Sequence, residues 1–493
     1  MLDYIIINQD DTVGVALKDI EAGFFLDCRF GSLTLKENIP AGHKFALKDI
    51  VDGEPVIKYG HTIGYAVGYI PAGSHVHTGN LKTSLGEILS YTYKPDYDDL
   101  EVTKQAYFNG YRRKDGKAGI RNQIWIIPTV GCVNSIAQAL EREAAFLAEG
   151  NVEGIIAFPH PYGCSQLGDD QDNTLKVLAG LINHPNAAGV LVLGLGCENC
   201  NIDVLKSYLQ NIDEDRVKFL QCQDTEEEID EGLKLLRELA GFAGQFSREP
   251  IEAKELIVGL KCGGSDGYSG ITANPLVGDF SDILISKQGT AILTEVPEMF
   301  GAENILMKRC ISEEVFNKTV SMINGFKEYY IRHEQPIYEN PSPGNKKGGI
   351  TTLEEKALGC TQKAGKAPVV DVLAYGEPVK ERGLNLLSAP GNDLVATTAL
   401  AVSGAQLVLF TTGRGTPFGS CVPTIKISSN SRLAQTKSNW IDFDAGRLAT
   451  GADRKKTAQE LFAYIMEVAS GKKVRAEEAG FHDIAIWKQG VTL

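Results

Sequence analysis

Four segments that contain glycine and cysteine each follow an apolar run that predicts a β-strand. The runs Ile126–Thr129, Ile155–Phe158, Val190–Leu195 and Leu256–Leu260 lead into Gly131-Cys132, Gly163-Cys164, Gly196-Cys197 and Cys262-Gly263, in that order. In an open parallel sheet, ligands bind outside the carboxyl ends of the strands. If the four strands lie in one sheet or in two facing sheets, their loops meet at one crevice. The competing interpretation is that the glycines form tight turns and the cysteines pack as small apolar side chains.

Cysteines in such loops can bind a metal as thiolates, and Cys164, Cys197 and Cys262 are the candidate ligands. Cys197 and Cys200 have C-x-x-C spacing, but one such pair without a second is weak evidence for structural zinc. Three loop cysteines could instead hold an iron–sulfur cluster, because thiolates are its usual ligands. The cluster is the alternative cofactor.

Two of the eight histidines stand close together, as His75 and His77. In an extended segment, residues two apart project from the same face, so both imidazoles can reach one divalent metal ion. The H-x-H pattern alone is nonspecific, because histidines in exposed turns are common. His160, in the loop before Cys164, is a weaker candidate for a catalytic histidine.

Two further segments offer groups that could act on a carboxylic acid. Glu295 and Glu298 follow a predicted strand and could bind a metal or act as a general base. Arg414 follows the apolar run at 406–411 and could hold a carboxylate through two hydrogen bonds. Each of these segments, taken alone, is more typical of a surface turn.

Two loops supply candidate contacts to an anionic substrate. The segment 111–122, YRRKDGKAGIRN, is locally basic and ends in Arg121 and Asn122, although a solvated charged turn explains the same composition. Ser265 and Asp266 lie in CGGSDG, which does not match the G-x-G-x-x-G pattern of dinucleotide sites. Nucleotide binding is therefore poorly supported, and these four residues are candidates for binding the substrate.

The composition restricts the partners. A net charge of −14 and a pI near 5.2 lack the basic character of a nucleic-acid binder. No stretch reaches the ~20 apolar residues of a membrane span. The first residues, MLDYIIINQDDT, lack the basic region and cleavage site of a signal peptide. We expect a cytoplasmic protein that acts on a small molecule, with no nucleic-acid or membrane partner, and a homo-oligomer stays open.

More than one domain must position these candidate groups. The chain has 493 residues, whereas a single hydrophobic core rarely serves more than ~250–300 residues. Residues 1–95 alternate short β-rich runs with Pro/Gly turns and predict a small β-rich domain, followed by a polar linker at 96–105. Residues 106–245 alternate strand-like and helical runs, which predicts a parallel sheet covered by helices. A second α/β subdomain is expected at 250–493. The expected fold class is therefore multidomain, with a β-rich N-terminal domain and two α/β subdomains built on mainly parallel sheets.

Hydrophobic periodicity predicts the individual elements of both α/β subdomains. In the first, the expected strands are 123–129, 154–158, 189–195 and 217–221, and the expected helices are 135–147, 174–182, 202–209 and 225–239. Thr225 followed by Glu228 gives the last helix a capping-box pattern. In the second, the expected strands are 255–260, 289–293, 369–373, 384–388 and 406–410, and the expected helices are 313–332, 392–403 and 455–469.

Taken together, the motifs resemble the altronate/galactarate dehydratase family over nearly the whole chain and in the family's order. IPAGHKFAL, EPVIKYG and the segment that contains the two histidines are similar to the family's N-terminal SAF-type domain. The segments similar to its catalytic region are GYRRKDGKAGIRN, PTVGCVN, YGCSQLGDD, GLGCEN, LKCGGSDGYSGITANP, LTEVPEMFGAE, SAPGNDLVATTAL and FTTGRGTPFG.

The resemblance implies a lyase that removes water from an aldonate such as altronate and yields a 2-keto-3-deoxy acid. It implies iron(II) or manganese(II) as cofactor, with His75 and His77 as the first metal ligands. The family pattern has a third histidine where this chain has Gly79. Two alternatives stay open: a dehydratase for another sugar acid such as galactarate, and a non-catalytic protein that binds sugar acids.

Dehydration of an aldonate requires a base for the C2 proton, a positive centre at the carboxylate and an acid for the C3 hydroxyl. We expect Glu295 or Glu298 to be the base or a metal ligand. Arg121 or Arg414 is expected to hold the substrate carboxylate.

Overall fold

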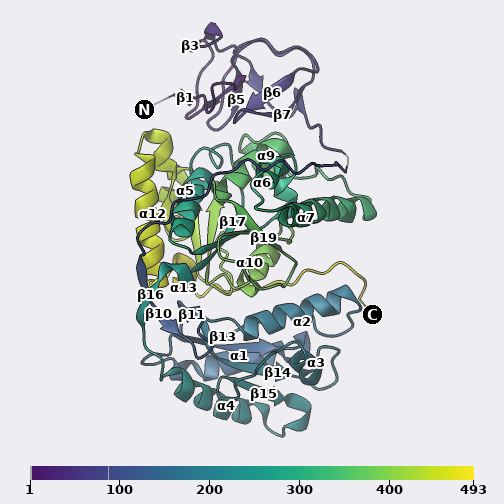
Figure 1. Cartoon of the computed structure of the whole chain (residues 1–493), viewed down its shortest axis with the longest axis vertical. Helices are drawn as coiled ribbons and strands as arrows, with labels where there is room; N and C mark the ends of the chain where they lie inside the picture. The colour runs from purple at the N-terminus through teal and green to yellow at the C-terminus, as the bar shows by residue number, and fades with distance from the viewer. Residues whose placement is uncertain (1–2, 87, 493) are drawn as a thin grey trace.

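The computed structural model describes residues 3–86 and 88–492. Its three parts follow one another along the longest axis of the molecule (Figure 1). A β-rich N-terminal domain lies at one end, the larger α/β domain in the middle and the smaller α/β domain at the other end. The expected fold class is confirmed, with antiparallel strands at the N-terminus and parallel sheets after them. In the described part of the chain, no helix is both long and apolar enough to cross a membrane.

The N-terminal domain consists of short antiparallel strands closed by glycine turns. Its elements are β1 (Tyr4–Ile5), β2 (Val13–Ala16), β3 (Phe25–Cys28), β4 (Gly31–Thr34), β5 (Lys44–Ala46), β6 (Pro55–Lys58), β7 (His61–Ala66), β8 (His75–Val76) and β9 (Leu81–Lys82). One sheet has the order β1-β2-β5-β8 and another β6-β7-β9. Buried isoleucines bridge the turns in pairs, Ile20 with Ile39 and Ile50 with Ile70.

The smaller α/β domain has a four-stranded parallel sheet in the order β13-β12-β14-β15. Its elements are β12 (Gln123–Pro128), α1 (Asn134–Glu143), β13 (Gly154–Ala157), α2 (Asp169–Ile182), β14 (Ala187–Gly194), α3 (Ile202–Lys206), β15 (Val217–Gln221) and α4 (Glu228–Ala243). Every residue of β14 is buried, as expected of a central strand with helices on both faces.

The larger α/β domain has a seven-stranded parallel sheet in the order β19-β20-β18-β17-β21-β22-β23. Its strands are β17 (Ile257–Cys262), β18 (Thr290–Leu293), β19 (Val369–Leu373), β20 (Leu384–Leu387), β21 (Leu407–Thr412), β22 (Thr424–Ser428) and β23 (Phe443–Asp444). Its helices are α5 (Ala273–Ser286), α6 (Glu303–Met307), α7 (Glu313–Arg332), α8 (Pro343–Lys347), α9 (Leu353–Cys360), α10 (Asp393–Val402), α11 (Ser431–Thr436), α12 (Arg454–Ala469) and α13 (Arg475–Glu478).

A small antiparallel sheet joins the two α/β domains, in the order β11-β10-β16. Its strands are β10 (Tyr107–Arg112), β11 (Ala118–Gly119) and β16 (Glu249–Glu252). The segment 88–105 does not hang free as a linker but packs on the larger domain, where Tyr93 Oη donates to the Cys310 carbonyl at 3.1 Å. The C-terminal tail returns to the smaller domain, where the amide of Gln489 donates to Asp170 at 2.7 Å.

The predicted start of the helix at 225–239 is wrong. Helix α4 begins at Glu228, and Thr225 does not cap it, because its hydroxyl donates to the carbonyl of Gln221 instead.

Candidate functional site

The two histidines predicted as metal ligands lie where the N-terminal domain meets the larger α/β domain, and a third histidine joins them. Pairing of β5 with β8 places Phe45 opposite His75. His43, just before β5, therefore lies beside His75, with Nδ1 and Nε2 3.0 Å apart. Two neighbouring nitrogen ligands at about 2.1 Å from one ion are ~3 Å apart, so this spacing suits a shared ion. The ring of His77 lies 5.0 Å from that of His75, centroid to centroid.

The turn after His77 fixes the orientation of this group. Asn80 accepts the amide of His77 at 2.8 Å and donates to the carbonyl of His75 at 2.9 Å. The amide of Gly79 donates to His77 Nδ1 at 2.9 Å, and a Cβ at position 79 would lie 2.7 Å from the ring. With His77 in this orientation, a side chain at position 79 would crowd its ring, and the third imidazole comes from His43.

Burial and nearby groups favour the neutral form of His43 and His75. Burial, together with the neighbouring His43, His77 and Lys44, lowers the pKa of His75 to about 4. Burial also lowers the pKa of His43. Neutral imidazoles keep the lone pair that a metal ion requires.

Glycines of the larger domain press closely against this histidine turn. His43 Nε2 lies 3.3 Å from the carbonyl oxygen of Lys347. The amide of Gly267 donates to the carbonyl of Gly348 at 2.7 Å, and a Cβ on Gly267 would lie 1.9 Å from the carbonyl of Gly42. Only a residue without a side chain fits here, so CGGSDG and the loop after α8 form the floor beneath the histidines.

A buried ion triad fastens the two domains together beside the histidines. Glu355 on α9 accepts from Lys44 at 2.9 Å and from Lys58 at 2.8 Å. All three side chains are at most 1% exposed. Burial opposes ionisation of Glu355, but Lys44 and Lys58 outweigh it and lower its pKa to about 2.

A second polar layer inside the larger domain includes Cys360, the last residue of α9. Cys262, at the end of β17, lies 2.8 Å from Glu298 and 3.3 Å from Cys360, sulfur to sulfur. Cys360 lies 3.2 Å from Glu298. In the described residues these three form the one group whose ligand atoms all lie within 4.8 Å of one another. Such a triad is consistent with a bound metal.

Three buried lysines surround this triad and pair with its Glu298 and with the neighbouring Glu295. Lys356 lies 2.7 Å from Glu298, and Lys261 and Lys363 lie 3.0 and 3.7 Å from Glu295. Burial raises the pKa of Glu298, but Lys356, Lys363 and Lys261 outweigh it and hold the pKa at about 2. Both predicted glutamates are therefore brought together, but they are enclosed, at most 4% exposed.

A hydrogen bond to Cys360 and burial raise the pKa of Cys262, so the thiol form dominates at neutral pH. Between the two layers lies a void of about 10 Å³, lined by Lys58, Asp266, Glu355 and Cys360 among others. That volume is about the size of one water molecule.

Arg414, which was predicted to bind the substrate carboxylate, is accessible to solvent and lies next to the CGGSDG loop. Its side chain is exposed, and its amide donates to the carbonyl of Gly264 at 3.0 Å. Ser265 and Asp266 are buried in the same floor. Asp266 accepts from Ser429 at 2.7 Å as well as from its own turn, so it shapes the loop rather than facing solvent.

Arg121, Asn122 and His160 are not available to a substrate. Arg121 is saturated by Glu477, at 2.7 and 2.8 Å, and by three backbone carbonyls. Asn122 is buried and bonded to Arg113 at 2.7 Å. Both nitrogens of His160 contact the backbone, Nε2 the carbonyl of Pro128 at 2.8 Å and Nδ1 an amide at 3.2 Å. These contacts join domains and loops.

The predicted cysteine ligands do not converge on one crevice with the histidines. Cys132, Cys164 and Cys197 lie in the smaller domain, after β12, β13 and β14. Cys262 ends β17 in the other sheet and is buried. The four strand-end loops therefore belong to two separate sites.

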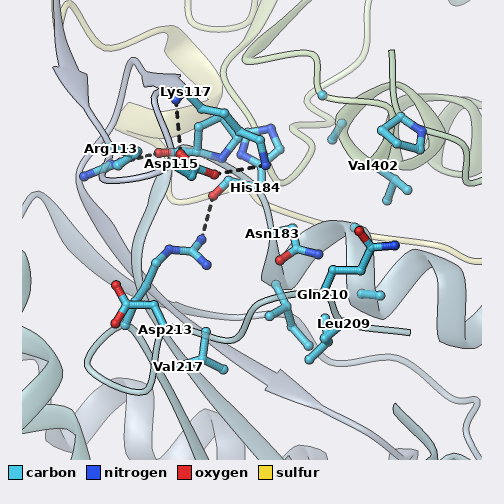
Figure 2. Close-up of a pocket in the computed structure, with 18 of the residues that line it drawn as sticks. Arg113, Asp115, Lys117, Asn183, His184, Leu209, Gln210, Asp213, Val217 and Val402 are labelled. Atoms are coloured by element: carbon cyan, nitrogen blue, oxygen red, sulfur yellow. Dashed lines mark hydrogen bonds and ion pairs between the residues drawn. The ribbon is translucent and has the colours of Figure 1, made fainter. Parts of the chain in front are cut away.

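A cleft of about 830 Å³ lies between the two α/β domains, and none of the predicted site residues lines it. Figure 2 shows Asn183 and Gln210 on one side of it and Asp115 and Lys117 on another. Lys117 is paired with Asp115 at 3.2 Å. His184 is bonded to a carbonyl, and burial lowers its pKa to about 3. The cleft is a domain joint without a free catalytic group among the residues that line it.

Sequence reasoning missed His43, Cys360 and the lysines of both layers. His43 follows Ile-Pro-Ala-Gly, the same four residues that precede Ser74 and His75. This repeated tetrapeptide was the sequence feature that could have identified His43 as a partner of His75. Nothing local in the sequence links Cys360 to Cys262, since 98 positions separate them.

Comparison with known families covers almost the entire chain. Residues 2–84 match the altronate/galactarate dehydratase SAF domain. Residues 110–243 match the second domain of D-galactarate dehydratase/altronate hydrolase, and residues 253–492 match the C-terminal domain of D-galactarate/altronate dehydratase.

Full-length relatives agree with these matches. The chain is 52% identical to altronate dehydratases from Bacillus subtilis (strain 168) and Escherichia coli (strain K12), covering 100% of each chain in both pairs. It is 34% identical to galactarate dehydratase (L-threo-forming) from Escherichia coli (strain K12), over 97% of this chain and 95% of that one.

Proposed function

The chain belongs to the altronate/galactarate dehydratase family, and we propose that it is a hydro-lyase that dehydrates D-altronate to 2-dehydro-3-deoxy-D-gluconate. The observation that carries this proposal is the 52% identity over full length to two altronate dehydratases. Galactarate dehydratase is a more distant relative, at 34%.

The cofactor we propose is Fe²⁺ or Mn²⁺, held by His43 and His75 with His77 beside them. The donor set supports it, because burial favours the neutral form of His43 and His75 and two of their nitrogens are 3.0 Å apart. When bound, the ion would supply a positive centre that stabilises negative charge developing on the substrate carboxylate.

The triad of Cys262, Glu298 and Cys360 is the less suitable place for that ion. It is buried, whereas His43 and His75 are only partly buried and reachable by a substrate. Lys356 already neutralises Glu298 at 2.7 Å. A divalent ion there would have to displace a buried ammonium or remove two thiol protons.

Glu298 is also a weak candidate for the general base, since a pKa of about 2 makes a carboxylate a poor proton acceptor near pH 7. We propose that Glu295 and Glu298 instead neutralise the buried lysines beneath the CGGSDG loop. Glu295 adopts the left-handed conformation, φ 69°, which turns its carboxylate back to accept the Cys262 amide at 2.8 Å.

Arg414 is the residue we propose to hold the substrate carboxylate. Replacing Arg414 by Gln removes a charge-assisted hydrogen bond of about 1.5–3 kcal/mol. We expect kcat/KM for altronate to fall by about ten- to a hundredfold, mainly through KM. Steady-state kinetics measures this. Arg432→Gln, another exposed arginine, is the matched control and should behave like wild type. An unchanged KM in Arg414→Gln would remove this residue from the site.

A substrate panel tests the proposed reaction. The purified full chain is incubated with Fe²⁺ or Mn²⁺ and with altronate, galactarate or other epimeric aldonates, and 2-keto-3-deoxy acid is quantified. We expect the highest kcat/KM with altronate. A clear preference for galactarate would reassign the substrate. Binding of sugar acids without any product, with either ion, would favour the non-catalytic alternative.

A further inference from the structure

Three exposed cysteines gather at one edge of the smaller α/β domain, outside the site described above. Cys132, Cys164 and Cys197 follow β12, β13 and β14, which are neighbouring parallel strands. The carboxyl ends of parallel strands lie at the same edge of a sheet, so the three loops are adjacent. The larger α/β domain separates this domain from the N-terminal domain, which holds the histidines (Figure 1).

Backbone contacts lock the three loops together. The amide of Gly131 donates to the carbonyl of Tyr162, and the amide of Cys200 to the carbonyl of Gly163, both at 2.9 Å. A Cβ on Gly163 would lie 1.9 Å from the carbonyl oxygen of Thr129. The thiols next to these glycines are therefore presented from a rigid frame.

Two polar side chains of these loops, Glu198 and Gln166, differ in whether the protein satisfies them. The carboxylate of Glu198 is satisfied within the loops, because it accepts hydrogen bonds from Thr129 and from the amides of Leu195 and Gly196. Gln166 uses its carbonyl oxygen for Gly163 at 3.1 Å, while its buried amide nitrogen has no partner in the described structure. An unpaired buried donor beside Cys164 points to an acceptor that the protein itself does not supply.

We propose that Cys132, Cys164 and Cys197 bind an iron–sulfur cluster. Two thiolates at about 2.3 Å from one ion are at most ~4.6 Å apart. The three sulfur atoms are not all within 4.8 Å of one another, so a single ion does not bridge them in this arrangement. In a cluster each thiolate binds a different iron, which suits wider spacing. Each thiol releases its proton on binding.

The neighbouring cysteines are poorer ligands. Burial raises the pKa of Cys200 to about 12 and that of Cys222 to about 11, which disfavours their thiolates. Cys132, by contrast, is exposed just before the ten-residue helix α1, whose N-terminus favours negative charge. Three thiolates leave one iron of a four-iron cluster without a cysteine, open to water or a small oxygen ligand.

Iron and acid-labile sulfide analysis of the full chain, purified anaerobically or reconstituted with iron salt and sulfide, tests the proposal. We expect about four of each per chain, with the charge-transfer absorption of iron–thiolate bonds. Cys132→Ser, Cys164→Ser and Cys197→Ser should each lose sulfide and absorption, while Cys222→Ser and Cys28→Ser retain both. Circular dichroism and gel filtration check that each variant is folded.

The measurement of acid-labile sulfide tests the cluster independently of the proposed hydro-lyase activity, because a metal ion bound by His43 and His75 carries no sulfide. Iron or zinc bound without sulfide in the wild type would overturn it. Equal loss of the cluster in Cys222→Ser or Cys28→Ser would overturn the ligand assignment. A cluster that survives in folded Cys164→Ser and Cys197→Ser would do the same.

Discussion

Replacing His75 by Ala should abolish metal-dependent dehydration of altronate while the protein stays folded. His75 contributes the nitrogen that lies 3.0 Å from His43 Nδ1, so its loss leaves one ring of the proposed pair. Charge stabilisation by a metal contributes several kcal/mol to such a reaction, so kcat should fall about a thousandfold or more. Turnover and bound Mn²⁺ per chain are measured together.

His61 provides the matched control for this experiment. It is an exposed histidine on β7 of the same domain. His61→Ala should keep the metal content and turnover of wild type, and His43→Ala should reproduce the loss seen in His75→Ala. Turnover near that of wild type in a folded, metal-loaded His75→Ala protein would contradict the assignment.

Replacing Glu355 by Gln should weaken the attachment of the N-terminal domain by about 3–5 kcal/mol. The substitution keeps the shape but leaves two ammonium groups, Lys44 and Lys58, buried together without a counter-charge. The measurement is the first transition in urea or thermal unfolding, together with protease sensitivity of the N-terminal domain. Activity should fall too, because Lys44 adjoins His43.

Controls for Glu355→Gln come from the same domain and from pH. Glu54 pairs with Lys48 nearer the surface, 26% and 33% exposed, so Glu54→Gln should cost at most about 1 kcal/mol. The folded-state pKa of Glu355, about 2, lies below its unfolded value of about 4.3. Its contribution is therefore complete above about pH 4.3 and is lost as pH falls toward 2. An unchanged first transition in Glu355→Gln would show that the triad does not hold the domains together.

Hydrophobic periodicity was sufficient to place many of the elements. Val217–Gln221, Val369–Leu373 and Glu313–Arg332 coincide with β15, β19 and α7. These segments are bounded by clear turn residues, and their apolar patterns match the observed burial. The start of α4 was misplaced because Thr225 found a local carbonyl partner, a competition that propensity alone does not resolve.

The composition of the site was less predictable, because tertiary contacts decide which polar groups remain free. Arg121 looked like a substrate clamp, but Glu477, 356 positions later, saturates it. Pairing of β5 with β8 brings His43 next to His75, and only the repeated Ile-Pro-Ala-Gly suggested this. Cysteines that look alike in sequence separate into a buried pair and an exposed trio.

The central claim is that the catalytic ion is held by the histidines between the N-terminal and larger α/β domains. Anomalous diffraction at the manganese edge, from crystals of the full chain grown with Mn²⁺, tests it most directly. We expect a peak bound by His43 and His75. A peak confined to Cys262, Glu298 and Cys360, with none at the histidines, would contradict it.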